Sequence, residues 1–346
     1  MTQPPHPTGF TGHLLSQGEK APGPLVIAHR GASGLRPEHT RAAYDLAIDQ
    51  GCDFIEPDLV MSSDGHLIVR HENEIGGTTD VADRPGFAAR HTLKVIDGLT
   101  VEGWFTEDFT LAELKTLRAR ERLPVLRPDN TAFDGREPLL TFQEIIDIAR
   151  EGSARTGRTI GVCPELKHPS WFASLGLAME DPFVAALQTN GLTDAQAPVL
   201  IQCFEVGTLQ GLRARIAAPL LQLIAAATGP ADRLDLSPAR MVSPAGLSEI
   251  AAYADYIGVE TLLIEPRDDT AAALAPTSLI TDAHAAGLKV AAWTFRAENL
   301  FLPLGDRRGG DLTAQGDLTA QLRRFGDYGL DAAFSDFPAI AAAARA

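Results

Sequence analysis

Cysteine is scarce in this sequence. Only 3 of its 346 residues are cysteine, at Cys52, Cys163 and Cys203. This odd number at wide spacing gives neither a disulfide framework nor a cysteine-based zinc site. All three lie within apolar runs, so we expect them in the core.

Positive charge and long apolar runs are scarce as well. The chain has 30 Lys and Arg against 45 Asp and Glu, a formal net charge of −15. Such a field repels polyanions, which makes nucleic acid and anionic lipid poor partners. The longest apolar stretches, such as Ala217 to Ala227, are shorter than the roughly 18 residues that span a bilayer, so no stable membrane insertion is expected. Nothing in the sequence specifies an oligomeric state.

Residues 1–24 are predicted to be an N-terminal extension. The segment is rich in Pro, Gly and Thr and has neither a basic start nor a long apolar run. As written it is not a signal peptide, which favours a cytoplasmic location. A periplasmic or secreted location is the alternative if a leader has been removed.

From Leu25 onward, short β-rich runs alternate with helical patterns. Together with 45% hydrophobic residues, this alternation is typical of βα units around a parallel sheet. Eight strands are predicted, the number that closes a barrel: Val26–Arg30, Asp53–Leu59, Ile160–Leu166, Val199–Phe204, Leu220–Ala225, Tyr256–Glu260, Val290–Phe295 and Ala333–Asp336. We therefore expect an α/β fold, a TIM (β/α)8 barrel over residues 25–346.

Helices are predicted between these strands, among them Glu38–Gln50, Phe142–Glu151 and Pro276–Ala286. Residues 72–138 form a long insertion after the second strand, with a short helical pattern at 111–120. An insertion there lies on the active-site face of a barrel, so we interpret it as a small cap subdomain. A tandem hexamer, Gly-Asp-Leu-Thr-Ala-Gln at 310–315 and 316–321, is too short for a solenoid and is expected to lengthen a loop or helix start.

Two carboxylates in the second strand give the clearest chemical signal. Glu56 and Asp58 are two residues apart, so their side chains point to the same side of a strand that its apolar neighbours mark as buried. Buried carboxylates repel one another unless a cation joins them, and hard divalent ions prefer oxygen ligands. Glu165 and Lys167 repeat the spacing at the third strand, where a simple ion pair is the alternative.

Two histidines come at strand ends. His29 and Arg30 end the first strand before Gly31, which places a proton-transfer group and a cation at the barrel mouth. The run from His66 to His71 is predicted to be a hairpin arm that returns His71 to the same mouth. Taken alone, each histidine also fits a structural role.

The ordered motifs resemble the glycerophosphodiester phosphodiesterase family. The motifs are His-Arg-Gly at 29–31, Pro-Glu-His-Thr at 37–40, Glu-Pro-Asp at 56–58, Asp-Gly at 64–65, His71 and Glu-Leu-Lys at 165–167. Stretches near Trp104, Gln202, Trp293 and Asp336 also resemble it, and the match runs from about residue 25 to 338. The Asp-Phe-Thr-Leu run at 108–111 and the Trp-Thr pair at 293–294 resemble the longer bacterial branch, which acts with Ca²⁺.

The resemblance implies roles for particular residues. Glu56, Asp58 and Glu165 would hold one divalent cation, Ca²⁺ before Mg²⁺, with His29 and His71 as acid and base. Arg30 and Lys167 would contact phosphate. Phe204 and Trp293, at predicted strand ends, are expected to line the glycerol side of the pocket. This sequence has His39 where the family usually has Asn, and Glu72 where Asp is common.

The expected function is metal-dependent hydrolysis of glycerophosphodiesters to sn-glycerol 3-phosphate and an alcohol. The nucleophile is either the substrate's own 2-hydroxyl or water. One alternative is a phospholipase D-like enzyme acting on lysophospholipids, which requires exposed apolar residues on the cap. The other is a non-catalytic barrel that binds phosphate esters, which would have lost a ligand or a histidine.

Overall fold

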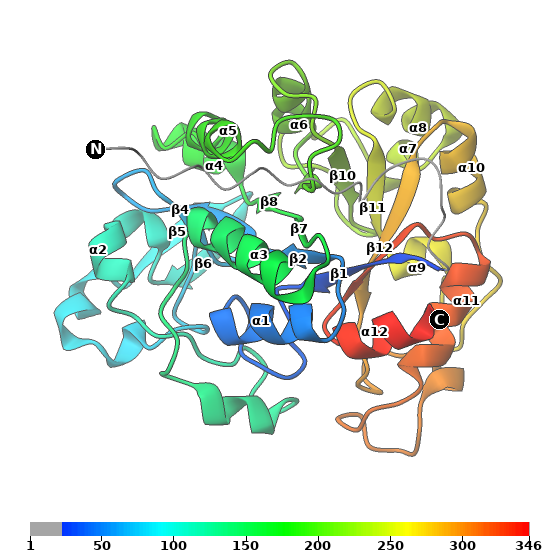
Figure 1. The fold of residues 1–346 in the computed structure, drawn as a ribbon, viewed down its shortest axis with the longest axis horizontal. Coiled ribbons are helices and arrows are strands. Elements are labelled where there is room, and N and C mark those ends of the chain that lie inside the picture. The colour runs from blue at the N-terminus through cyan, green and yellow to red at the C-terminus, as the bar shows by residue number, and fades with distance from the viewer. Residues whose placement is uncertain (1–22, 346) are drawn as a thin grey trace.

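The computed structural model describes residues 23–345, which form a closed barrel surrounded by helices (Figure 1). Its main sheet has eleven strands, and the pairing closes because the first strand bonds in parallel to both the second and the last. The predicted TIM barrel is confirmed. Its strands are β1 Leu25–His29, β2 Phe54–Glu56 with β3 Asp58–Met61, β7 Gly161–Val162 with β8 Glu165–Leu166, β9 Ile201–Cys203, β10 Leu220–Ile224, β11 Tyr256–Glu260, β12 Lys289–Phe295 and β13 Ala332–Ser335.

Two barrel strands are interrupted by proline. Pro57 separates β2 from β3, and Pro164 lies between β7 and β8. Proline has no N–H to donate to a ladder, but its carbonyl still accepts. Glu165 donates its N–H to the Pro57 carbonyl at 2.9 Å, and Gln202 donates to the Pro164 carbonyl at 2.9 Å. The barrel therefore stays closed across both interruptions. Counting each interrupted pair as one strand, it has the eight strands that were predicted.

Strand residues alternate between the barrel interior and the surrounding helices. Ile27, Leu221 and Phe334 belong to the smaller core cluster, which fills the interior, while their neighbours pack outward in the larger cluster. All three cysteines are buried and free, as expected. Because the period is two, the side chains at the carboxyl ends of the strands continue these inward rows into the mouth of the barrel.

Helices cover the outside of the barrel (Figure 1). They are α1 Arg41–Asp49, α3 Phe142–Thr156, α4 Pro169–Ser174, α5 Glu180–Thr189, α6 Val206–Arg213, α7 Pro238–Met241, α8 Pro244–Ile250, α9 Thr261–Ile264, α10 Leu279–Ala285, α11 Leu318–Asp327 and α12 Pro338–Ala344. A capping box starts α3, since Thr141 accepts from the Glu144 N–H and the Glu144 side chain accepts from the Thr141 N–H.

Some predicted helix bounds were wrong. The helix expected from Glu38 begins at Arg41, capped by the Thr40 side chain. His39 has a φ of 58°, which no right-handed helix contains, and Glu38 is used to bind arginines. The helix expected at 276–286 begins at Leu279, and the pattern at 111–120 gives only the short α2 Leu111–Leu114.

The hairpin arm predicted before His71 is present as β4 Leu67–Val69, antiparallel to β3. The inserted segment that follows carries a second hairpin, β5 Thr92–Ile96 and β6 Leu99–Gly103. Asp97 and Gly98 turn it, with φ values of 48° and 81°. Two left-handed residues in a two-residue loop are the arrangement that an Asp-Gly pair favours in a hairpin.

The two copies of the hexamer adopt different structures. In the first copy Asp311 accepts hydrogen bonds from Thr313 within a loop, and in the second Asp317 caps α11 by accepting from the Ala320 N–H. The predicted role in a loop or helix start is confirmed. Within residues 23–345, no helix combines the length and apolar character needed to cross a bilayer.

Candidate active site

A cavity of about 890 Å³ opens at the carboxyl ends of the barrel strands, the face on which TIM-barrel enzymes carry their sites. Eight of the nine residues predicted for the site line it, and they come from β1, β2, the end of β4, β8, β9 and β12. They are His29, Arg30, Glu56, His71, Glu165, Lys167, Phe204 and Trp293. The ninth, Asp58, is buried beside them. Residues from most of the chain thus meet in one place.

Three buried carboxylates form the floor of this cavity. Glu56, Asp58 and Glu165 each offer an oxygen, and these oxygens all lie within 4.8 Å of one another. Burial and the charge of Asp58 raise the pKa of Glu56 well above its usual range, and burial also raises the pKa of Glu165. The group is therefore short of positive charge and could hold a divalent cation.

Two cations already contact the floor. Lys167 lies 2.8 Å from Glu165 and 3.2 Å from Asp58, measured from Nζ to the carboxylate oxygens. The backbone N–H of Arg30 donates to the Glu56 carboxylate at 2.8 Å, and the side-chain Nε of Arg30 lies 3.3 Å from the Asp58 carboxylate. Burial alone would raise the pKa of Asp58, but the neighbouring positive charges hold it well below its usual range. Arg30 is also shared with Glu38 at 2.9 Å, so these two cations do not fully neutralise the three carboxylates.

His39 is buried and contacts Asp58, one of the three carboxylates of the floor. Its Nε2 lies 2.9 Å from Asp58 Oδ2 and its Nδ1 lies 2.8 Å from the Tyr44 hydroxyl. Burial lowers the pKa of His39, and contacts at both ring nitrogens hold the ring in one orientation. The φ of 58° is one that His, like Asn, adopts more readily than most residues. The histidine at this position thus fixes the orientation of Asp58.

His29 is held by a carboxylate at the end of the last strand. Its Nδ1 lies 2.6 Å from Asp336, which also accepts from Arg127 at 2.5 Å and from Arg296 at 3.0 Å. Burial, with the nearby charge of Arg30, lowers the pKa of His29 to about 4. A carboxylate bound to Nδ1 orients the ring and leaves Nε2 available for proton transfer.

His71 is held in the same way. Its Nδ1 lies 2.5 Å from Glu72, and Glu72 accepts from Arg122 at 2.6 and 3.0 Å. Burial, followed by the charges of Arg30 and Lys167, lowers the pKa of His71 to about 3. Both histidines are therefore neutral at neutral pH, each with a carboxylate on Nδ1 and an arginine behind that carboxylate.

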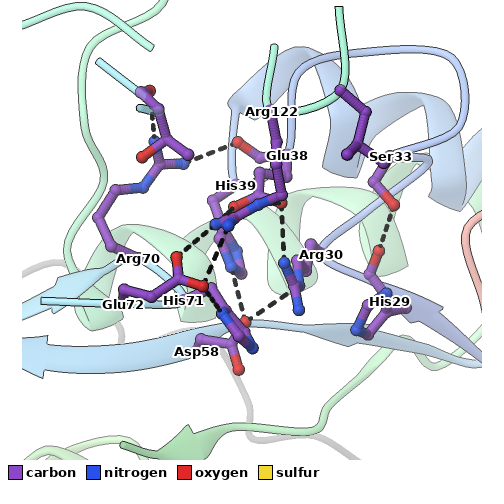
Figure 2. Close-up of polar contacts among 12 residues, drawn as sticks. His29, Arg30, Ser33, Glu38, His39, Asp58, Arg70, His71, Glu72 and Arg122 are labelled. Atoms are coloured by element: carbon purple, nitrogen blue, oxygen red, sulfur yellow. Dashed lines mark hydrogen bonds and ion pairs between the residues drawn. The ribbon is translucent and has the colours of Figure 1, made fainter. Parts of the chain in front are cut away.

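Figure 2 shows a line of alternating charges from the insertion to the floor. Arg122, from the insertion, binds Glu38 as well as Glu72. Its Nε and Nη2 donate to the two carboxylate oxygens of Glu38 at 2.8 and 2.6 Å. Glu38 in turn accepts from Arg30 at 2.9 Å, and Arg30 lies against Asp58. One guanidinium of the insertion thereby contacts the supports of both His71 and Arg30.

An aromatic wall closes one side of the cavity. Phe204 and Trp293 meet edge to face with centroids 5.9 Å apart, and the Trp293 indole donates to the Gly258 carbonyl at 3.0 Å. Lys167 Nζ lies 6.0 Å from the Phe204 ring centre. Phe337 is buried and packs against Gly34, as part of the core.

Sequence reasoning missed several contacts of the site. Gln202 donates to Glu56 at 3.0 Å, a role that the inward row of β9 could have indicated. Arg296 directly follows β12, so its place at the end of a predicted strand could also have indicated it. Arg122 and Arg127 were missed without any such signal, because an arginine in a charged loop usually faces solvent. The Asp97-Gly98 pair, flanked by alternating apolar residues, was a readable hairpin signal.

Two carboxylate-bound histidines beside three buried carboxylates, at the carboxyl end of a parallel barrel, are an arrangement compatible with a hydrolase. The chain belongs to the glycerophosphoryl diester phosphodiesterase family, whose model matches residues 29–340. The prediction of an enzyme, a glycerophosphodiester phosphodiesterase, is confirmed.

Curated relatives agree with this assignment, and a solved structure shares the fold. Glycerophosphodiester phosphodiesterase GDPD6 of Arabidopsis thaliana is 36% identical over 81% of this chain and 77% of its own length. The Haemophilus influenzae glycerophosphodiester phosphodiesterase is 30% identical, covering 68% of each chain. An Oleispira antarctica phosphodiesterase solved in complex with the product sn-glycerol-3-phosphate has the same fold, with a TM-score of 0.61 and 22% identity over 93% of this chain and 96% of that one.

Proposed function

We propose that the protein hydrolyses glycerophosphodiesters to sn-glycerol 3-phosphate and an alcohol, using a divalent cation and two histidines. The observation that carries the proposal is one cavity in which two carboxylate-oriented histidines, His29 and His71, share a mouth with a floor of three carboxylates. A non-catalytic binding barrel would have no use for this complete set.

Glu56, Asp58 and Glu165 would hold the cation. Ca²⁺ binds oxygens at about 2.3 to 2.6 Å, so ligands on opposite sides of the ion lie up to about 5 Å apart. Oxygens within 4.8 Å of one another fit that requirement. When bound, the ion would neutralise charge on the phosphoryl oxygens. Ca²⁺ is proposed before Mg²⁺ because of the family branch that the sequence resembles.

The histidines would move protons at their Nε2 atoms. With Nδ1 bound to Asp336 or Glu72, a neutral ring presents an unprotonated Nε2, which is the state of a general base. One histidine would take the proton of the attacking hydroxyl, and the other, after taking a proton from solvent, would give it to the leaving alkoxide. Each transfer is worth about 10² to 10⁴ in rate.

Lys167 and Arg30 would contact the non-bridging phosphate oxygens. Both line the cavity, and both are held by the carboxylates of the floor. Phe204 and Trp293 would pack against the glycerol backbone. Residues 72–138 would act as a cap, since Ile96, Leu99 and Val101 of its hairpin line the same cavity.

The test is a metal titration of glycerophosphocholine hydrolysis. Protein treated with EDTA should be inactive and should recover with Ca²⁺, while Glu56→Gln and Glu165→Gln should need much more Ca²⁺ for half-recovery. Glu102→Gln, which removes an exposed carboxylate of the insertion, is the matched control and should titrate like the parent. Full activity after EDTA treatment would exclude the proposed metal dependence.

A further inference from the structure

A turn of the insertion, residues 122–127, has an arginine at each end. Leu126 and Arg127 both donate their N–H groups to the Leu123 carbonyl, at 2.9 and 2.8 Å, and Pro124 lies inside the turn. The side chain of Arg127 is 6% exposed and that of Arg122 is 27% exposed. Because a proline fixes its own φ and the turn is closed by hydrogen bonds, the two arginine side chains start from fixed places.

Arg127 binds the carboxylate that holds His29. Its Nη2 donates to Asp336 at 2.5 Å, its Nε to Glu298 at 2.7 Å and its Nη1 to the Ser33 carbonyl at 2.9 Å. All three nitrogens of the planar guanidinium are therefore engaged, which fixes its plane and with it the place of the Asp336 carboxylate. Since Asp336 is bound to Nδ1 of His29, the guanidinium is separated from that ring by one carboxylate.

Arg122 joins two carboxylates that serve different parts of the site. Its Nη2 lies 2.6 Å from both Glu38 and Glu72, its Nε lies 2.8 Å from Glu38, and its Nη1 lies 3.0 Å from Glu72. Glu72 holds His71, and Glu38 binds Arg30. One rigid fork thus fixes both carboxylates relative to each other, which the single nitrogen of a lysine could not do.

These two arginines differ from the others that form ion pairs in the insertion. Three further arginines bind carboxylates of the insertion itself, and they are Arg84, Arg90 and Arg120. Arg122 and Arg127 instead bind carboxylates from the barrel, and neither is among the residues that line the catalytic cavity. Both lie around a smaller cavity that His29 and Asp336 also line. Their contacts are therefore with the supports of the site and not with its contents.

We infer that Arg122 and Arg127 are positioning residues for the proposed reaction, so that the 122–127 turn fixes the orientation of both proton-transfer histidines. The inference rests on the proposed function, in which His29 and His71 move protons. A ring whose Nδ1 partner can rotate presents its Nε2 atom in more than one direction. Groups that orient metal-bound histidines cost about 10- to 100-fold in activity when they are removed, and we expect losses in the same range here.

The experiment measures kcat and KM for glycerophosphocholine at saturating Ca²⁺. Arg127→Met should lower kcat about 10- to 100-fold and leave KM nearly unchanged, because this arginine does not reach the substrate. Arg127→Lys keeps the positive charge and should recover part of kcat. Arg120→Met, which removes the same charge two residues before the turn, is the matched control and should behave like the parent.

Arg127→Met leaves two buried carboxylates without their cation and could unfold the protein. Arg122→Met, at a site that solvent reaches, covers that case and should also lower kcat at least about tenfold. Folded variants with kcat close to that of the parent, or an equal loss in Arg120→Met, would overturn this inference and leave the proposed function standing. No turnover by the parent protein would overturn the proposed function itself.

Double-mutant cycles test whether each arginine acts through its carboxylate. In an Asp336→Asn background, Arg127→Lys should lower kcat by less than about twofold, because the carboxylate that it fixes is already gone. Arg122→Met should likewise cost less in a Glu72→Gln background than in the parent. A merely structural role predicts losses that multiply, and multiplying losses in either cycle would contradict the positioning role of that arginine.

Discussion

The two histidines of the site have the same kind of support but different surroundings. His29 is held by Asp336, whose side chain is 3% exposed, whereas His71 is held by Glu72, whose side chain is 37% exposed. Asp336 follows the last barrel strand and accepts from two arginines, while Glu72 accepts from Arg122 of the insertion. One supporting carboxylate is buried and the other is partly exposed to solvent.

The difference indicates which parts of the fold each of the two histidines proposed for proton transfer depends on. Asp336 is surrounded by protein, so water cannot replace it. Glu72 is reached by solvent, so water can take over part of its hydrogen bonding. We therefore expect equal loss when either histidine is removed, and unequal loss when its supporting carboxylate is changed.

The largest effect is expected from the histidines themselves. His29→Asn and His71→Asn remove Nε2 while keeping a polar group near the Nδ1 position. Each should lower kcat for glycerophosphocholine by about 10² to 10⁴. Circular dichroism and thermal unfolding should show that both variants remain folded. Turnover within threefold of the parent for either variant would remove that histidine from the mechanism.

Changes to the two supporting carboxylates should have different effects on kcat. Asp336→Asn removes a buried charge that orients His29, and we expect kcat to fall about 10²-fold or more. Glu72→Gln changes a partly exposed group, and about tenfold is expected. Steady-state kinetics of both variants measures the ratio. Equal losses of kcat would show that the burial of the supporting carboxylate makes no difference to its histidine.

The pH dependence of stability gives the next effect. The folded pKa values of His29 and His71, about 4 and about 3, lie below the unfolded value near 6.5. The unfolded chain therefore binds protons first, so this contribution to stability is complete above pH 6.5 and is lost as pH falls towards 4.

Each histidine contributes up to about 1.4 kcal/mol per pH unit in that window. His29→Asn and His71→Asn should each make the fall in the free energy of unfolding less steep between pH 6.5 and 4. Urea unfolding of metal-free protein measures the slope. An unchanged slope in both variants would show that neither ring is held neutral by the fold.

The smallest effect is expected at the tip of the hairpin. Asp97 lies 2.6 Å from His168 Nδ1 and joins the insertion to the loop after β8 at the rim. Asp97→Asn keeps a turn-favouring Asn-Gly pair but removes the charge. A partly exposed ion pair contributes about 0.2 to 1 kcal/mol, so KM should rise by a factor of about 1.4 to 5 with kcat unchanged. A change in kcat alone would contradict this role.

Much of the barrel could be predicted because its chemistry repeats locally. The alternation of strand and helix patterns predicted the eight strands of the barrel. The two-residue period predicted that Glu56 and Asp58 share one side of their strand, and likewise Glu165 and Lys167. His29 and His71 needed the family resemblance, because a strand-end histidine has no distinctive local pattern.

The rim could not be predicted in the same way. Arg122 and Arg127 lie in a charged, proline-containing stretch that resembles a solvated loop, and only the three-dimensional fold buries their head groups against carboxylates. The start of α1 was predicted wrongly for a related reason, since Glu38 and His39 serve the site instead of the helix.

The position of Arg122 between Glu38 and Glu72 means that the insertion is not an interchangeable part. Exchanging residues 73–138 with the corresponding segment of a relative would leave both carboxylates in the recipient without their guanidinium, unless the donor segment brings an arginine to the same place. During divergence, new caps can therefore be accepted only as coordinated changes with the acidic residues that flank β1 and β4. Substrate range in such a lineage would change by substitution at the hairpin tip more readily than by replacement of the whole segment.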